Sequence, residues 1–491
     1  MRDIIFTFFN YFVFFYTSML AIFFVTFAFL SFISLKRRKD YYVESYMRKT
    51  IKESPYTPGI SVIAPAFNEE KTIIDNVNSM LALEYPLFEV VIVNDGSTDS
   101  TLKKMIEHYE LIEVPYAYIE RIKTKPFRRL FKSTSPKYSR LTVVDKENGG
   151  TKADASNAGI NVSSYPYFIC TDVDCILEKY ALYRCISPII SSDKQVIAVS
   201  GTMLMANGCV VKDGQIVDVR TPRTPIPLFQ NLEYMRSYLI GKMGWSAING
   251  MPNVSGGFGL FDRSVAIAAG GYDGTSFAED MDLITRMVGY MCDFSRPYKI
   301  IQIPDTCCWT EGPPNLAMLY RQRTRWARGL FQTPSIHHKM IFKKTYKQMG
   351  LLTLPYMFVF EFLAPIIELT GLIVFIYLAF TGAVNWNTAW MIYLTIYTFC
   401  QFLSIVVITY DYYVGMLYKR GYEYLWIIIA SILEPIFYHP IITFCSLRGY
   451  LSYLTNRDFK WKNMERKGFK QKEEKTDDAE TAAMKPEPAT I

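Results

Sequence analysis

Ile60-Ser61-Val62-Ile63-Ala64-Pro65-Ala66 is a short apolar run that ends in a polar turn, and it decides the fold of the region that follows. Runs rich in β-branched residues that stop at polar residues predict strands. A second such run occupies residues 90–93, and helix-like segments begin near Lys71 and Ser100. The sequence therefore predicts a repeating β-α unit, a fold in which ligands bind at the carboxyl ends of the strands.

A pair of carboxylates follows a third apolar run. Asp172-Val173-Asp174 comes just after residues 167–170, so both carboxylates are expected where a strand ends at the carboxyl edge of the sheet. Mg²⁺ and Mn²⁺ prefer carboxylate ligands, and substrate phosphates complete their shell. The motif predicts a site for a cation that neutralises a leaving nucleoside diphosphate, whereas an isolated Asp-x-Asp is more often a solvated loop.

Two further motifs supply the rest of a sugar-transfer reaction: Glu279-Asp280 and Gln322-Arg323-Thr324-Arg325-Trp326. A hydroxyl that attacks an anomeric carbon needs a general base, for which Asp280 is the candidate, with Glu279 orienting it. Arg325 would meet the charge on the departing diphosphate, and Trp326 offers a flat face to a sugar ring. Taken singly, Glu279-Asp280 is more often a helix N-terminal turn, and Trp326 also fits a membrane-interface anchor.

The order of these motifs resembles that of the membrane-bound family 2 glycosyltransferases, particularly the polymerising branch that includes cellulose, chitin, hyaluronan and poly-N-acetylglucosamine synthases. The resemblance runs over residues 59–329 and continues in the hydrophobic C-terminal part. It implies an α/β fold, a GT-A-type nucleotide-sugar-binding domain with a Rossmann-like mixed sheet, flanked on both sides by transmembrane helices. It also implies an inverting, metal-dependent hexosyltransferase that takes a UDP-sugar and uses Mg²⁺ or Mn²⁺.

The same resemblance implies roles for individual residues. Residues 64–70 and 93–99 look like nucleotide-contacting turns, and residues 148–157 look like the basic stretch against the diphosphate. The implied donor-binding residues are Ala66, Glu69, Asp95, Lys152, Asp172, Gln322 and Arg325. Glu69 and Asp95 would meet the uridine, and Lys152 the diphosphate. The implied metal ligands are Asp172 and Asp174, the catalytic residues Asp280 and Glu279, and the acceptor-binding residues Ser255, Gly256, Phe258 and Trp326.

A glycine-rich apolar stretch, residues 253–261, lies between the metal motif and the candidate base. Glycines let a backbone approach a ligand closely, and the family has a similar segment at its acceptor site, so we expect these glycines to be functional. Phe258 either stacks on an acceptor sugar or belongs to the core of a bulged strand, and the residues favour neither alternative.

The N-terminal region predicts a membrane anchor. Residues 4–35 contain no charged residue, which is enough for a tilted transmembrane helix and too long for the apolar part of a signal peptide. Lys36-Arg37-Arg38-Lys39 follows directly. Because lysine and arginine favour the cytosolic side, we expect the N-terminus outside and the catalytic domain in the cytosol.

Three more hydrophobic stretches lie at about residues 351–383, 388–410 and 424–447. Their ionisable residues Glu361, Glu368, Glu434 and His439 either line a pore or pair within a packed bundle. One anchor and three spans would leave the C-terminus outside, yet the basic residues between 448 and 467 favour the cytosol. A third stretch that only dips into the membrane, or a split first stretch, would reconcile the two.

The expected organisation is an anchor (1–35), a cytosolic linker (36–58), a GT-A domain (59–335), interfacial and transmembrane helices (336–450), and a basic cytosolic segment with a disordered tail (451–491). This predicts a multi-pass protein of the inner or plasma membrane. The expected partners are a nucleotide sugar, a glycan or lipid acceptor, membrane lipids, and export or accessory subunits. The net charge of +7 requires no nucleic acid, because juxtamembrane basic residues facing anionic lipid account for it.

Two other features predict local chemistry only. The nine cysteines have no metal-ligand spacing and are expected to be free thiols in a reducing cytosol. The basic insert at residues 123–140 is either a solvated loop or a surface for anionic lipid or an anionic acceptor.

Three functions fit these patterns. A polymerising synthase that feeds a β-linked polysaccharide through its own helices is favoured by the Gln322–Trp326 motif, which is typical of that branch. A non-processive transferase that adds one sugar to a lipid is the alternative. A transporter or scaffold with an inactive transferase-like domain is the third, and the acidic and basic residues at 172, 174, 280 and 325 argue against it.

Overall fold

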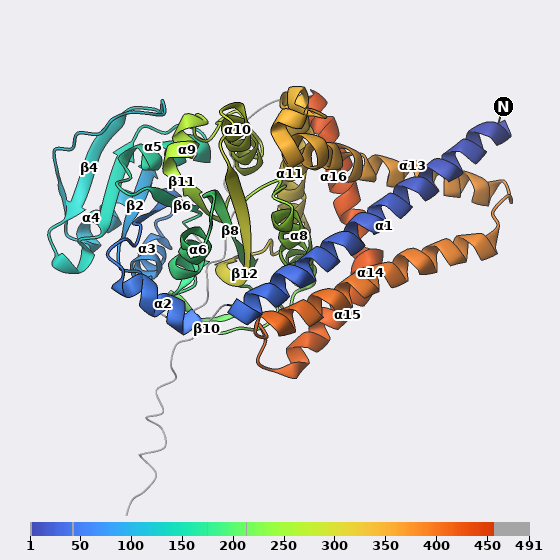
Figure 1. Cartoon of the computed structure of the whole chain (residues 1–491), viewed down its shortest axis with the longest axis horizontal. Helices are drawn as coiled ribbons and strands as arrows, with labels where there is room; N and C mark the ends of the chain where they lie inside the picture. The colour runs from blue at the N-terminus through green and yellow to red at the C-terminus, as the bar shows by residue number, and fades with distance from the viewer. Residues whose placement is uncertain (1, 42–43, 174, 213, 456–491) are drawn as a thin grey trace, which may run out of the picture.

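The computed structural model of the chain describes residues 2–41, 44–173, 175–212 and 214–455. A sheet domain forms one end of the molecule, and long helices extend from the other (Figure 1). The strands of the main sheet are β1 (Ile60–Ala66), β2 (Phe88–Asp95), β3 (Leu111–Glu113), β4 (Phe127–Ser133), β5 (Leu141–Lys146), β6 (Tyr167–Thr171), β7 (Ile176–Leu177), β8 (Gln195–Met205), β11 (Phe258–Asp262) and β12 (Tyr298–Thr310). A separate hairpin pairs β9 (Val210–Lys212) with β10 (Gln215–Asp218).

The sheet is mixed, and its parallel part creates the edge at which the site forms. The ten strands lie in the order β3-β4-β5-β2-β1-β6-β11-β8-β12-β7. Strands β5, β2, β1 and β6 are parallel neighbours, so their carboxyl ends meet at one edge. The three strands predicted from apolar runs are confirmed as β1, β2 and β6. The antiparallel β11 then joins β6 to β8 and brings the glycine-rich stretch to the same edge.

Helices cover the sheet and continue into the apolar end. Those of the sheet domain are α2 (Glu44–Glu53), α3 (Ile73–Leu81), α4 (Thr101–His108), α5 (Lys152–Val162), α6 (Ala181–Ile190), α7 (Pro225–Arg236), η2 (Ser237–Lys242), α8 (Met243–Ala247), α9 (Arg263–Ala268), α10 (Glu279–Asp293) and α11 (Leu316–Ile336), with short turns η1 (Pro136–Tyr138), η3 (His338–Met340) and η4 (Lys344–Tyr346). The predicted helices near Lys71 and Ser100 are α3 and α4.

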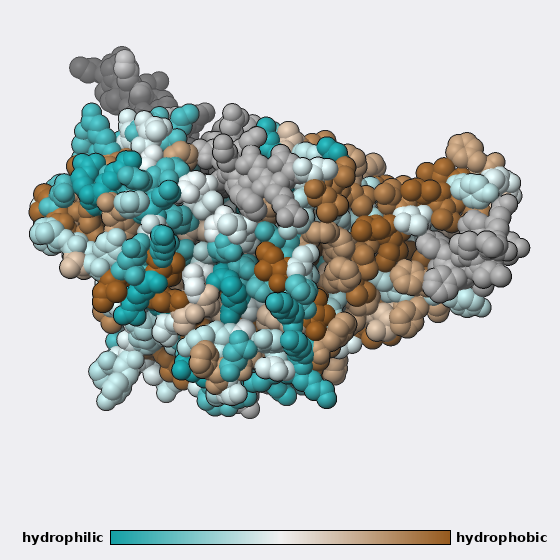
Figure 2. Space-filling model, turned by 90° about the horizontal axis from the view of Figure 1, so that it is seen from above, coloured by the Kyte–Doolittle hydropathy of each residue, from teal (hydrophilic) through white to brown (hydrophobic). Residues whose placement is uncertain are grey.

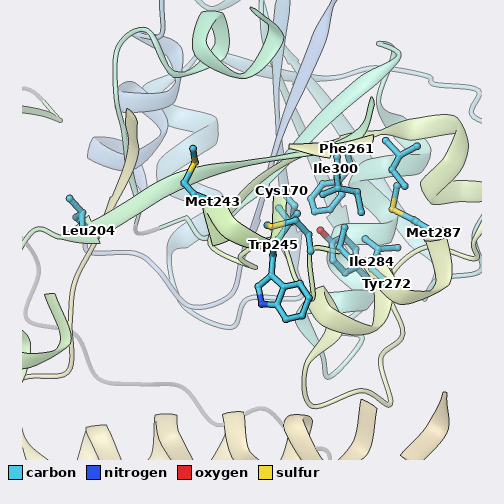
Figure 3. Packing of buried hydrophobic residues seen from close by; sticks show 14 of the residues in the cluster. Cys170, Leu204, Met243, Trp245, Phe261, Tyr272, Ile284, Met287 and Ile300 are labelled. Carbon is cyan, nitrogen blue, oxygen red and sulfur yellow. The ribbon is translucent and has the colours of Figure 1, made fainter. Parts of the chain in front are cut away.

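The core explains how α10 is held. Its buried residues recur every three or four positions, as in an amphipathic helix packed on a sheet. Figure 3 shows Ile284 and Met287 of this helix near Phe261 of β11 and Ile300 of β12, and all four belong to one buried cluster. Trp245 of α8 belongs to the same cluster. The helix that begins with Glu279 and Asp280 is therefore fixed relative to the sheet.

The apolar end is built from α1 (Arg2–Tyr41), η5 (Met349–Thr353), α12 (Leu354–Tyr356), η6 (Met357–Phe362), α13 (Ala364–Phe380), α14 (Trp386–Val414), α15 (Gly421–Phe437) and α16 (His439–Thr455). Three helical segments among the described residues are long and apolar enough to cross a membrane: Tyr11–Arg38, Met349–Phe380 and Trp386–Val414. The pair α15 and α16 passes the same test together but is bent by 50°. On the face in Figure 2, hydrophobic residues gather over this end.

The arrangement bears on several sequence predictions. The N-terminal end of α1 and the connection between α13 and α14 lie at the same end of the molecule (Figure 1). Strand β4, from the basic insert, lies at the opposite end of the sheet, away from the apolar helices, so the insert does not adjoin the membrane that these helices would cross (Figure 1). Residues 456–491, with most of the predicted basic segment and tail, lie outside the described residues, as does Asp174.

Candidate active site

One cavity of about 3020 Å³ extends from the carboxyl edge of the sheet to the apolar helices. Its walls at the sheet include Lys152 and Asp172, followed by Asp280 of α10 and Arg325 of α11. Residues of α1, α13, α14, α15 and α16 line the remainder. Motifs that are far apart in the sequence therefore line one continuous cavity.

Lys152 forms the cationic part of the sheet edge. It is the first residue of α5, whose N-cap Thr151 accepts a hydrogen bond from Asp154 N. Its ammonium pairs with Asp172 Oδ1 at 2.5 Å and donates to the Gly256 carbonyl at 2.7 Å. Burial lowers the pKa of Lys152, but Asp172, Cys170 and Glu279 outweigh burial and leave this pKa raised. The lysine is therefore charged, beside a helix N-terminus that favours anions.

The Gly256 peptide connects this cation to the candidate base. Its carbonyl accepts from Lys152, and its N–H donates to Asp280 Oδ2 at 3.0 Å. The other carboxylate oxygen of Asp280 accepts from Met281 N at 2.9 Å. Two backbone donors thus orient the carboxylate in the cavity wall, a place where a general base can reach an acceptor hydroxyl.

Glu279 differs from its neighbour Asp280. Burial, opposed by Arg325 and assisted by Asp280, raises the pKa of Glu279. A like charge next to a carboxylate favours protonation of one of the two. The first turn of α10 is thus both the helix N-terminal turn and the site of two unequal carboxyl groups, so the two sequence interpretations are compatible.

Helix α11 carries the predicted motif along the cavity wall. Gln322, Arg323, Arg325 and Trp326 all line the cavity. Arg323 is in addition buried and makes two hydrogen bonds of 2.6 Å to Glu233 and one of 2.9 Å to the Tyr438 hydroxyl. Its guanidinium also lies 4.5 Å from the Trp326 ring centroid, so Arg323 holds Trp326 in place.

Three predicted donor residues lie at the strand ends but outside the cavity wall. In the described part of the chain, Ala66, Glu69 and Asp95 are absent from the lining. Asp95 Oδ1 accepts from Lys146 Nζ at 2.8 Å and from Gly149 N at 3.0 Å. This carboxylate therefore orders the loop that leads to Lys152.

The predicted acceptor stretch divides between the cavity wall and the core. Ser255 and Gly256 line the cavity. Phe258 has an exposed fraction of 0% and packs in the core with Val199 and Cys307. The prediction that Phe258 binds the acceptor is therefore wrong, and its alternative as a core residue is correct.

Ionisable residues among the apolar helices are both paired and cavity-lining. Glu434 of α15 forms an ion pair with Arg236 at 2.8 Å, and His439 contacts Glu368 at 3.2 Å. All four residues line the cavity, together with Glu361. The sequence left open whether these residues line a pore or pair within the helix bundle. In the structure the paired residues also line the cavity. All nine cysteines are free, as predicted.

The sequence motifs missed one wall completely. Helix α7 continues through the π-helix η2 into α8, and this rod lines the cavity with Glu233, Tyr234, Arg236, Tyr238 and Lys242. The signal that could have found it is the presence of charged residues within an otherwise apolar and aromatic helical run.

Two protein-family models match the sequence of this chain. The model for glycosyl transferase family 2 matches residues 61–203, and that for glycosyl transferase family group 2 matches residues 222–410. The chain belongs to the family 2 glycosyltransferases. Its mixed α/β sheet, with candidate membrane helices before and after it, has the predicted GT-A-type architecture.

Curated relatives have similar sequences over the catalytic part. A poly-beta-1,6-N-acetyl-D-glucosamine synthase of Staphylococcus aureus (strain COL) is 29% identical over 273 residues, which are 55% of this chain and 54% of the relative. The Staphylococcus epidermidis protein of the same name is 28% identical over 277 residues, 56% of each chain. The chain thus spans about half the length of the curated relatives it matches.

Solved structures show a more distant likeness. A mannosyltransferase, PcManGT from Pyrobaculum calidifontis, in complex with GDP-Man and Mn²⁺, has a TM-score of 0.49 at 18% identity, covering 84% of this chain and 99% of that one. S. aureus TarS 1-349 in complex with UDP-GlcNAc has a TM-score of 0.34 at 17% identity, covering 59% of this chain and 72% of that one.

Proposed function

We propose that the chain transfers sugar units from a UDP-activated donor to a growing β-linked polysaccharide, and that the product leaves between its own membrane helices. The observation that carries this proposal is the continuity of the cavity, which joins Lys152, Asp280 and Arg325 to the space lined by α1, α13 and α14. A site for adding one sugar to a small acceptor needs no such extension.

The geometry supports a single displacement. The acceptor hydroxyl oxygen bonds to the anomeric carbon, the bond from that carbon to the diphosphate breaks, and the diphosphate keeps the electron pair. The hydroxyl proton passes to Asp280, which Gly256 and Met281 orient. Lys152 and Arg325 face the charge that develops on the diphosphate. One displacement inverts the configuration at the anomeric carbon.

The residues also suit a divalent cation. Asp172 places a carboxylate in the cavity wall, 34% exposed, beside the lysine proposed to hold the diphosphate. Mg²⁺ typically takes one or two carboxylates plus substrate phosphates, and that donor set fits Asp172 with the sequence-predicted Asp174. When bound, the cation would neutralise part of the diphosphate charge. The described residues contain no cluster of three or more acidic, histidine or cysteine side chains that could hold a metal without the substrate.

The acceptor class and the membrane placement rest on other support. The curated relatives are named as synthases of a β-linked polysaccharide, and cavity-lining Trp326 offers a ring to a bound sugar. Lys36 and the three basic residues after it lie at the end of α1 that meets the sheet domain, which favours a cytosolic catalytic domain. We therefore place the protein in the cell membrane as a multi-pass enzyme that draws on cytosolic donors.

A panel of labelled nucleotide sugars tests the proposal. The full-length protein, purified in detergent, is incubated with each donor, and both nucleoside diphosphate release and product size are measured. Consumption of a UDP-sugar with a high-molecular-weight product is expected. A lipid carrying one sugar would replace the polymerising function by the single-addition alternative, and no turnover of any nucleotide sugar would contradict a catalytic role.

A further inference from the structure

The segment that precedes the proposed base has no regular secondary structure and lies in the cavity wall. Residues 273–278, here called the base loop, lead into α10, and Ser276, Phe277 and Ala278 of this loop line the cavity. Ala278 is the N-cap of α10 and makes no side-chain capping hydrogen bond. Because Asp280 follows directly in the first turn of α10, its position depends on what holds the base loop.

Gln332 of α11 binds the base loop through both ends of its side-chain amide. Its Oε1 accepts from Phe277 N at 2.8 Å, and its Nε2 donates to the Thr275 carbonyl at 3.0 Å. A backbone N–H can only donate and a carbonyl can only accept, so these partners fix which end of the amide is the oxygen. The side chain is 4% exposed, and polar groups shielded from water are costly to leave unpaired. Gln332 is not among the described residues that line the cavity, so it acts on the loop and not on a substrate.

Two neighbours of Gln332 hold α11 against the same loop. A side-chain carbon added at Gly329 would lie 2.4 Å from Ala278 Cβ and 3.0 Å from Ala278 N. The Arg328 guanidinium lies 3.8 Å from the Phe277 ring centroid. Residues three and four apart share a helix face, so these contacts and the amide of Gln332 belong to one side of α11. The backbone of α11 therefore lies directly against the N-cap of α10.

The helix that holds the base loop also carries a residue of the proposed reaction. Arg325, proposed to face the diphosphate, lies on α11 about two turns before Gln332. A separate contact, from His337 Nε2 to Asp282 Oδ1 at 2.8 Å, holds α10 and α11 together farther along. Loss of the Gln332 amide should therefore free the base loop without separating the two helices.

We propose that Gln332 is a positioning residue that sets the distance between Asp280 and Arg325 by holding the base loop on α11. The inference rests on the proposed function, because it takes Asp280 as the general base. A base must lie within about 3 Å of the hydroxyl whose proton it takes, and a misplacement of about 1 Å can cost about 10² in rate. Without the two amide hydrogen bonds, Asp280 reaches this geometry in a smaller fraction of the enzyme–substrate complexes.

Turnover and donor affinity of the full-length protein in detergent test this role, with the UDP-sugar identified by the donor panel. Gln332→Met keeps the length of the side chain and removes both hydrogen bonds. It should lower kcat by about 10 to 10², while the donor dissociation constant stays close to that of wild type. Gly329→Ala displaces Ala278 from the same side of α11 and should also lower kcat, so it tests the inference even where Gln332→Met does not fold.

A double-mutant cycle with Asp280→Asn separates positioning from structural damage. If Gln332 acts through Asp280, Gln332→Met should change the residual turnover of Asp280→Asn by less than about twofold. A purely structural defect would lower turnover by the same factor in both backgrounds, and that result would overturn the inference. The same cycle applies to Gly329→Ala.

Gln302 of β12 supplies a matched control. It is 3% exposed, its Nε2 donates to Thr202 Oγ1 at 3.2 Å and to the Ile303 carbonyl at 2.7 Å, and it lies outside the cavity lining formed by the described residues. Gln302→Met should therefore lower thermal stability as Gln332→Met does and leave kcat unchanged. An equal loss of kcat in the two variants would rule out the positioning role. Absence of turnover in wild type would contradict the proposed function, and the inference with it.

Discussion

The two ends of the catalytic cavity are built in different ways. The donor end uses short loops at the ends of parallel strands. Asp172 directly follows β6, and Lys152 is the first residue of the helix that follows β5. The acceptor end uses helices, with single side chains such as Lys242 and Trp326 contributed turn by turn. Strand-end loops concentrate chemistry in contiguous motifs, whereas a helical wall spreads it over many turns.

The largest effect is expected at the donor end. Lys152→Met removes the cation proposed to face the diphosphate and should lower kcat by about 10² to 10³, the scale for one lost electrostatic donor. Steady-state diphosphate release measures the change. Lys152→Arg is the control, because it keeps the charge and should retain more activity than the methionine variant. Wild-type kcat in Lys152→Met would show that the donor end does not hold the diphosphate.

Two neighbouring arginines of α11 should behave oppositely. Arg325→Met should reduce kcat by about 10² and leave thermal stability unchanged, because Arg325 faces the cavity. Arg323→Met leaves Glu233 without its bidentate partner and should destabilise the protein by roughly 3–5 kcal/mol.

Thermal unfolding in detergent distinguishes the two arginine variants. The double variant Glu233→Gln with Arg323→Met should recover part of the lost stability, because no half-buried carboxylate is then left without its cationic partner. A large loss of stability in Arg325→Met would contradict its assignment to the reaction.

A smaller effect should mark the contact between α1 and the acceptor wall. A side-chain carbon added at Gly244 would lie 2.7 Å from Phe27 Cβ, whereas one added at Gly241 meets nothing within 4 Å. Gly244→Ala should therefore destabilise by roughly 1–3 kcal/mol through overpacking. Gly241→Ala is the matched control and should be neutral or stabilising by up to about 1 kcal/mol. Equal unfolding temperatures of the two variants would show that α1 does not pack tightly here.

Sidedness can be measured with no expected effect on activity. Cys209 and Cys400 are the two cysteines that are not buried, so we replace them and introduce Asn385→Cys or Lys419→Cys. The connection that contains Asn385 lies at the same end of the molecule as the N-terminus (Figure 1). An impermeant thiol reagent applied to intact cells should label position 385 and not 419. The reverse pattern would place the nucleotide site outside the cytosol.

The difference between the two ends also explains what the sequence could predict. Strands β1, β2 and β6 were predicted because apolar runs and polar turns are local signals. The position of Phe258 was ambiguous because β11 is buried along its whole length. Such a strand has no alternation of apolar and polar residues that would show which side chains face the core. The pairing of Asp95 with Lys146 depends on the register of β2 with β5, which no local pattern reveals.

The central claim is that Lys152 and Arg325 bind the donor, whereas Asp280 takes the proton of the acceptor. It is tested most directly by Asp280→Asn, with donor affinity and turnover measured on the same protein. Asparagine keeps an oxygen that can accept from Gly256 N but cannot take the acceptor's proton. Titration with the UDP-sugar identified by the donor panel should give a dissociation constant close to that of wild type, while turnover falls by about 10² or more. A loss of donor affinity as large as the loss of turnover would make Asp280 a binding residue and contradict the account.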